Sequence, residues 1–327
     1  MDMLKSLKVL DDYFVDEPKP ILTAETLQVC LLREVLDYTI LRTEESRELN
    51  TVMTPTSVSD STPMQRVAFF GSKQKAVESR RLEILLRTAA EIHGIPIDEC
   101  YLKDHLCLRC PRCVLFGGTF ASVQKPDEGH KVANIKHRIS YSTAFSLAPY
   151  EDIHEAITQN AINDNTILTE RALFPRHSVR PASLFASVVS LQSVTWKEFV
   201  LALKAILSAH QYGAETRISG DVRNQVIGIA AGWEEIITPL ELTLELNEAM
   251  GRASELDAAS VKPILDRYAA QAANVKRVKV LDPKEVEALL EEVRNFDLSK
   301  EFVDGAYRDA IRFREQQGDK KAVWPKK

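Results

Sequence analysis

The chain has 327 residues, of which 45% are hydrophobic and 27% are charged. This composition fits one large domain or two, and it excludes a disordered chain or a small disulfide scaffold. A formal net charge of −5 excludes a histone-like protein coated with positive charge, although a local basic groove remains compatible with it. No apolar run approaches the about 18 residues of a membrane span, and residues 1–6 lead into no secretory segment. We therefore expect a cytoplasmic protein without membrane contact.

The first third of the chain predicts two stretches of strand and one core helix. Residues 27–41 are apolar and predict one long strand or a bent pair, whereas residues 42–63, rich in Thr, Ser, Glu and Pro, predict a mobile loop. Residues 67–71 predict a short strand that ends in a turn. The helix that follows is expected to begin at Ser79 as its N-cap and to end near Gly94.

The middle of the chain adds three strands and a second helix. Residues 138–145 alternate as a strand does, and the polar segment 160–181 is expected to project from the body. Residues 184–191 and 226–230 predict buried strands. The helix between them begins with a capping box at Thr195.

The order of elements predicts an α+β fold. Strand, helix, strand occurs twice, and two such units form the split β-α-β arrangement of ferredoxin-like, or RRM-like, folds. From Pro239 the chain becomes helical, as in the acidic amphipathic stretch 283–293, and the basic end, 320–327, is expected to fray. We therefore expect a palm domain over residues 1–235 and a helical C-terminal region over residues 236–327.

Four of the five cysteines lie close together with the spacing C-x6-C-x2-C-x2-C. In a reducing cytosol such a cluster favours a metal over disulfides, and the turn-forming Pro111 keeps the thiolates converging as tetrahedral zinc requires. Four ligands without an open position indicate a structural site. An iron–sulfur cluster and metal-free thiols remain alternatives, although the bacterial ferredoxin pattern needs a further Cys-Pro. The candidate ligands are Cys100, Cys107, Cys110 and Cys113, with His93, His105, His130 and His137 as substitutes.

A basic stretch surrounds the expected start of the first helix. The helix macrodipole disfavours cations there unless an anion is also present, and a phosphate would resolve this conflict. Helix amides and neighbouring lysines or arginines suit a nucleic-acid backbone. The alternative is a solvated charged face. The candidate contacts are Lys73, Lys75, Ser79, Arg80 and Arg81.

Two later segments could also bind RNA. The projecting segment mixes aromatic and basic side chains that suit base stacking and phosphate contact, and the loop 212–221 contains two glycines that allow a close approach of its amides. Plain surface and connecting loops are the alternatives. No Ser/His/Asp ordering, Walker A loop, GxGxxG or HExxH motif indicates nucleophilic catalysis or a nucleotide cofactor. The further RNA-binding candidates are Thr169, Arg171, Phe174, His177, Gly213, Thr216 and Arg217, with Arg138 on the strand before them.

In their order, these features resemble the repeat-associated (RAMP) proteins of CRISPR systems. The nearest match is the DevR-like backbone subunit of type I-D surveillance complexes (Cascade). That family places a glycine-basic hairpin, here 70–73, before a serine-capped basic helix that begins at 79–82. A cysteine-rich turn that closes in Leu-Phe-Gly follows at 110–118 and is the most specific part of the resemblance. A β-hairpin thumb maps onto about 150–182, and the glycine-containing loop onto 212–220, although this loop is poorer in glycine than the usual pattern.

The resemblance covers about residues 20–235 and has implications for fold and function. It implies a ferredoxin-like palm with an inserted zinc-bearing finger region at about 95–135. It also implies a non-catalytic subunit that polymerises along a CRISPR RNA, with the thumb of one copy crossing the RNA beneath the next. The implied partners are CRISPR RNA, further copies of the chain, the large, small and guide 5′-end-capping subunits of a type I-D complex, and target DNA or RNA paired with the guide.

Two other functions compete with this interpretation. In the first, a type III-like relative cuts target RNA with a divalent metal through a loop aspartate, and Asp60 is the candidate. That loop offers no second acid between residues 51 and 77, although metal-dependent nucleases usually gather two or more carboxylates. In the second, the chain is a zinc-stabilised adaptor that binds proteins and no nucleic acid.

Overall fold

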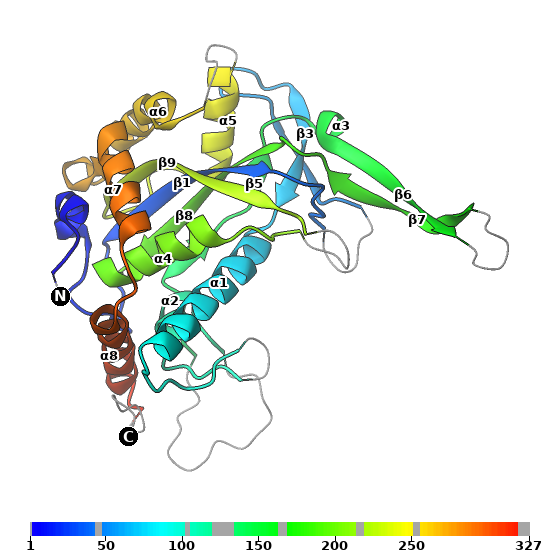
Figure 1. The fold of residues 1–327 in the computed structure, drawn as a ribbon. Helices are drawn as coiled ribbons and strands as arrows, with labels where there is room; N and C mark the ends of the chain where they lie inside the picture. Colours follow the sequence, from blue (N-terminus) through cyan, green and yellow to red (C-terminus); the bar gives the residue numbers. More distant parts are fainter. Residues whose placement is uncertain are drawn as a thin grey trace.

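The computed structural model describes residues 2–42, 48–101, 105–119, 134–162, 169–213, 219–250 and 256–319. These residues form one large antiparallel sheet with helices on both faces and a separate two-stranded hairpin (Figure 1). No helix in these ranges is both long enough and apolar enough to cross a membrane. The antiparallel sheet and its helices confirm the predicted α+β fold with a helical C-terminal region.

An interior strand of the large sheet is β1 (Thr26–Val35). It pairs antiparallel with β8 (Leu184–Gln192) on one side and with β9 (Val222–Gly232) on the other. The strand order is β10-β9-β1-β8-β5-β3-β2, and β4 pairs with β8 beside β5. The remaining strands are β2 (Thr51–Pro55), β3 (Pro63–Phe69), β4 (Ile139–Tyr141), β5 (Ala144–Ser146) and β10 (Lys279–Val280).

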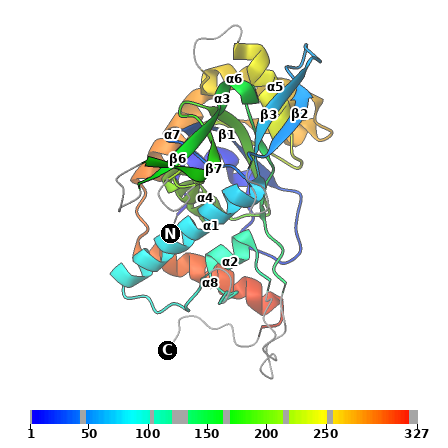
Figure 2. The ribbon, with the colours of Figure 1, turned by 90° about the vertical axis from the view of Figure 1, so that its right-hand side faces the viewer.

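The side chains of β1 alternate between two hydrophobic cores, as the two-residue period of a strand requires. Leu27, Val29 and Leu31 pack in the core beneath α1, α4, α7 and α8, whereas Cys30 and Leu32 pack in the core beneath α5 and α6. The C-terminal helices therefore complete both cores (Figures 1 and 2). The helices that cover the two cores are α1 (Gly71–Ile92), α4 (Trp196–Ser208), α5 (Pro239–Met250), α6 (Ala258–Gln271), α7 (Pro283–Asn295) and α8 (Lys300–Gln316). Two short 3-10 helices are η1 (Lys5–Tyr13) and η2 (Val275–Arg277).

Several predicted elements are present as expected. The strands predicted at 184–191 and 226–230 are β8 and β9. The helix between them, α4, begins with the predicted capping box, in which the Glu198 amide donates to Thr195 Oγ1 at 3.3 Å. The helix predicted over 283–293 lies within α7.

The start of the first helix was predicted wrongly. Helix α1 begins at Gly71 with Phe70 as its N-cap, two turns before Ser79, so residues 70–73 form no glycine hairpin. A Cβ atom at Gly71 would lie 2.2 Å from the Tyr141 carbonyl oxygen, so the close packing of α1 on β4 requires glycine. The loop predicted over 42–63 also contains β2, whose mostly exposed side chains hide the alternation of a strand.

A two-stranded hairpin projects from the body, as expected for the segment that contains residues 160–181 (Figure 1). Its strands are β6 (His154–Ile162) and β7 (Thr169–Val179), and the short helix α3 (Tyr150–Ile153) leads into it. At its root, Thr39 and Val179 exchange both backbone hydrogen bonds, at 3.1 and 2.8 Å. These bonds attach the hairpin to the segment after β1.

A buried ion pair joins the sheet to α1. Arg33 of β1 donates to Glu78 of α1 at 2.7 Å, and both side chains are 0% exposed. Arg33 also donates to Asn224 Oδ1 of β9 at 2.7 Å. The hydroxyls of Tyr141 and Tyr212 donate to Glu78 at 2.6 and 2.7 Å. Burial and the Glu78 carboxylate raise the pKa of both tyrosines well above its ordinary value.

We predict that Arg33→Met strongly destabilises the protein, because it leaves the Glu78 carboxylate buried without its counter-charge. Urea unfolding should show a loss of about 3–5 kcal/mol in the free energy of unfolding. The double variant Arg33→Met/Glu78→Leu removes both charges and should recover most of that loss. A single variant as stable as the wild type, or a double variant less stable than the single one, would contradict this role of the pair.

Candidate metal centre and basic surface

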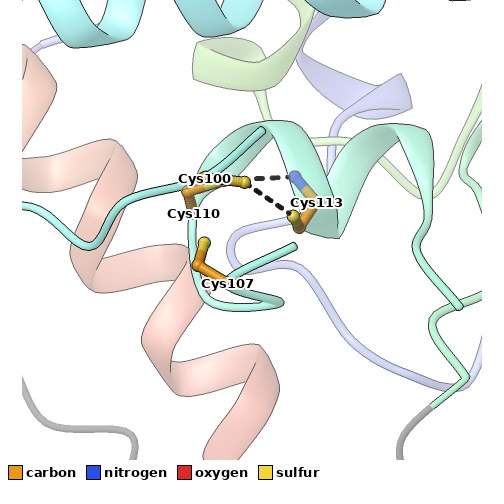
Figure 3. A group of neighbouring side chains, drawn as sticks. All are labelled: Cys100, Cys107, Cys110 and Cys113. Atoms are coloured by element: carbon orange, nitrogen blue, oxygen red, sulfur yellow. Dashed lines mark hydrogen bonds between the residues drawn. The ribbon is translucent and has the colours of Figure 1, made fainter. Parts of the chain in front are cut away.

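Four cysteines converge on the short helix α2 (Pro111–Phe116). Cys110 is its N-cap, and its sulfur accepts a hydrogen bond from the Cys113 amide, while Pro111 occupies the first helical position. The four Sγ atoms lie within 4.8 Å of one another (Figure 3). Cys100 Sγ lies 3.5 Å from Cys113 Sγ and 3.8 Å from Cys110 Sγ. The structure therefore brings together all four predicted ligands.

The spacing of the sulfur atoms fits a tetrahedral metal ion. Thiolates bound to zinc at about 2.3 Å at the corners of a tetrahedron lie roughly 3.8 Å apart, close to the two separations above. Backbone amides support the thiolates: Cys113 N donates to Cys110 Sγ, and Arg109 N donates to Cys107 Sγ, both at 3.4 Å. These cysteines can hold a metal such as zinc. Over the described residues the group contains cysteines alone, and His130 lies outside those residues.

The crowded thiols differ in acidity. Hydrogen bonds from Cys100 and from the two other neighbouring cysteines hold the pKa of Cys113 well below its ordinary value. Hydrogen bonding with Cys100 contributes most to raising the pKa of Cys107 and of Cys110. Tyr307 of α8 packs beside the cluster, and burial together with the thiols raises the pKa of its hydroxyl. Of these three thiols, Cys113 is therefore the one that loses its proton most readily.

The residues after the cysteines close the turn against the core. Gly117 ends α2 with φ +80°, a backbone conformation that favours glycine. A Cβ atom there would lie 2.8 Å from the Ile135 carbonyl oxygen. Phe116 is buried, and its ring is stacked with that of Tyr141 at a centroid distance of 6.2 Å. In the Leu-Phe-Gly sequence, Phe116 thus packs in the interior and Gly117 ends the helix.

The predicted cations of α1 do not share one face. Lys73 Nζ donates to the Ile40 carbonyl at 3.2 Å. Lys75 is half-buried, and burial together with Arg112 lowers its pKa. Arg81 Nε donates to Ser208 Oγ at 3.0 Å, and Arg80 is exposed. Since Lys73 and Arg80 are seven residues apart, these two cations lie on the same side of the helix.

Two residues predicted to bind RNA are buried instead. Ser79 is 2% exposed and accepts a hydrogen bond from Arg112 Nε at 2.7 Å. Arg138 is also 2% exposed, and its guanidinium donates to the Glu198 carboxylate at 2.9 Å and to the Ser193 carbonyl at 2.8 Å. This corrects the expectation that either side chain lies on an RNA-binding surface, because both are occupied by interior contacts.

The other candidates lie near the hairpin and the loop after α4. His177 is half-buried at the hairpin root, with Nδ1 2.7 Å from His154 Nε2. The carbonyl of Gly213 accepts a hydrogen bond from the Ile40 amide at 3.2 Å. The remaining candidates fall outside the described residues or side chains: Thr169, Arg171, Phe174, Thr216 and Arg217.

The loop between β2 and β3 has a second acid nearby that the sequence did not reveal. The Thr62 amide donates to Asp60 Oδ1 at 2.9 Å, and hydrogen bonds from Thr62 lower the pKa of Asp60. Glu248 comes from α5, and its carboxylate accepts hydrogen bonds from Ser57 and Ser59 in the same loop. No local motif could have identified Glu248, because α5 lies far away in the chain.

The chain is similar to known CRISPR proteins in sequence and in fold. A family model described as Csc2 Crispr matches residues 13–306. The crystal structure of Thermofilum pendens Csc2 is similar with a TM-score of 0.64 and 19% identity over 96% of each chain, so the two share a fold. A pre-nicking CRISPR RNA-guided surveillance complex contains a chain with a TM-score of 0.47 and 12% identity, over 82% of this chain and 99% of that chain. No curated protein matches the sequence.

Proposed function

Because this chain belongs to the Csc2 family of CRISPR proteins, we propose that it is the backbone subunit of a type I-D surveillance complex (Cascade). In this role it binds CRISPR RNA and presents the guide for pairing with target nucleic acid. The observation that carries the proposal is the family match over residues 13–306. A cytoplasmic complex would contain further copies of the chain, together with the large, small and guide 5′-end-capping subunits.

The sheet order supports a ferredoxin-like palm within this subunit. Its four adjacent positions are β9, β1, β8 and the short pair β4/β5, which is the 4-1-3-2 order of that fold when the strands are numbered along the chain. Helix α1 precedes the β4/β5 pair and α4 precedes β9, and both helices border the same core. We place the palm at residues 1–235, with the finger region at about 95–135 and the thumb at about 150–182.

An RNA-binding surface would combine the projecting hairpin with nearby cations. Single-stranded RNA is held by phosphate contacts and base stacking, which need basic and flat side chains rather than a catalytic cluster. Lys73 and Arg80 lie on one side of α1, and His177 lies at the hairpin root. The proposed set also contains Lys75, Arg81, Thr169, Arg171, Phe174, Gly213, Thr216 and Arg217.

We also propose that the four-cysteine site binds a structural zinc ion. Four thiolates complete a tetrahedral shell and leave no open position for a substrate or an activated water. Three of the proposed ligands, Cys100, Cys110 and Cys113, are buried in the core beneath α1, α4, α7 and α8. A bound ion would therefore fasten the finger region to the helices that cover the sheet.

We predict that the purified protein retains this ion. Purified protein should contain about one zinc per chain by metal analysis after mild dialysis, since all four ligands are already close together. Cys110→Ser, which removes one buried ligand, should lower that stoichiometry, whereas Cys30→Ser, at the buried cysteine of β1, should not. Protein without zinc, or brown protein that contains iron, would contradict the assignment.

Two cations of α1 should contact RNA phosphates. The double variant Lys73→Gln/Arg80→Gln should bind a guide RNA more weakly and reduce the slope of log affinity against log salt by about 1.4, that is, about 0.7 for each lost phosphate contact. The control is Arg267→Gln, which removes a half-exposed arginine from α6 on the other face of the sheet. Filter binding over a salt series measures both. Equal slopes for the double variant and the wild type would remove α1 from the RNA-binding surface.

We expect the assembled complex not to cleave its target RNA. The assembled protein, guide and complementary RNA should stay intact for hours with magnesium or manganese, because residues of the β2–β3 loop already donate hydrogen bonds to Asp60 and to Glu248 of α5. Denaturing gels of end-labelled target measure this. Evenly spaced cleavage that Asp60→Ala abolishes would favour the metal-dependent endoribonuclease instead.

A further inference from the structure

Arg112 is a buried cation inside the cysteine turn. It lies between Pro111 and Cys113, is 4% exposed, and belongs to α2. Its Nη1 atom lies 3.7 Å from Cys113 Sγ, within the range of a hydrogen bond to sulfur, and its Nε donates to Ser79 Oγ at 2.7 Å. One guanidinium therefore bridges a cysteine of the metal centre and the middle of α1.

The other arginine of the turn has a different role. Arg109 also lies next to a cysteine of the cluster, but its guanidinium pairs with Asp319 at 3.1 Å. Arg112 thus directs its side chain at the sulfur atoms, and Arg109 directs its side chain at the residues after α8. Substitution of each arginine therefore compares the loss of one positive charge at two positions of the same turn.

A metal-bound site of four thiolates would carry a negative charge, which the buried cation Arg112 can offset. Four thiolates and one divalent ion carry a net charge of about −2, and burial of that charge is unfavourable without compensation. Arg112 contributes a positive charge and an N–H donor to Cys113. Other charged groups near Arg112 are Lys75, a further cation, and Glu83, whose carboxylate is itself paired with Arg87 at 2.7 Å.

We propose that Arg112 is a positioning residue of the metal centre, which offsets the negative charge of the four thiolates and orients Cys113. Ser79 holds the guanidinium in place, so α1 takes part in metal retention without supplying a ligand. The inference rests on the zinc centre proposed above. Partners of metal ligands of this kind typically change metal affinity by about 10- to 100-fold when they are removed.

The test compares full-length variants by competition for zinc with a chromophoric chelator. Arg112→Gln removes the charge but keeps a polar side chain, and we expect metal affinity to fall by about 10- to 100-fold. Arg109→Gln makes the same change in the same turn and should leave the affinity as in the wild type. In the cobalt(II)-substituted protein, the sulfur-to-metal charge-transfer band should shift in Arg112→Gln and stay unchanged in Arg109→Gln.

A second variant keeps the test decisive if Arg112→Gln does not fold. Ser79→Ala leaves every charge in place and removes the partner that holds the guanidinium, so it should cause a smaller loss of affinity in the same direction. Ser79→Ala with wild-type affinity would then overturn the inference, as would equal affinities for Arg112→Gln and Arg109→Gln. Failure of the wild type to bind zinc or cobalt would instead overturn the metal centre itself.

Discussion

The buried pair of Arg33 and Glu78 is the constraint on which the arrangement of sheet and helix depends. Burial of two charges is costly unless their hydrogen bonds are satisfied, and here both oxygens of Glu78 accept at least one hydrogen bond. Nε and Nη2 of Arg33 have no hydrogen-bond partner within the described structure, but the guanidinium lies 5.3 Å from the ring of Tyr212. A one-residue slip of β1 would move Arg33 into the apolar core beneath α5 and α6, so the pair selects the register.

Other buried arginines connect the inserted segments to the sheet. Arg66 of β3 is 0% exposed and donates to the carbonyls of Thr56, Ser146 and Leu147, which ties the β2–β3 loop to the residues around β5. Arg138 similarly connects the segment before β4 to the start of α4 through Glu198. A guanidinium has several donors in a fixed plane, so one side chain can satisfy carbonyls from segments that form no regular ladder. Although the chain has a net negative charge, several of its arginines are thus buried and connect segments in the interior.

Features formed by residues close in the chain could be predicted from the sequence, whereas buried polar contacts between distant segments could not. The cluster of cysteines was predictable because all four are close in the chain, and β8 was predictable because its apolar run is continuous. The start of α1 was missed because its inward-facing residues include Gln74, Glu78 and Ser79, which are buried but polar, so apolar periodicity begins only at Leu82. The role of Arg138 was missed because nothing near it in the sequence announces Glu198 as its partner.

Three consecutive residues of α1 show how buried contacts fix the direction of an exposed side chain. Each residue of an α-helix is rotated by about 100° from the one before it, so Glu78, Ser79 and Arg80 point in three different directions. Glu78 points to Arg33 in the sheet, and Ser79 points to Arg112 in the cysteine turn. Because these two contacts fix the rotation of the helix, the third direction, that of the exposed Arg80, is fixed as well. The position of a proposed phosphate contact therefore follows from two buried polar contacts, one of which reaches the proposed metal centre.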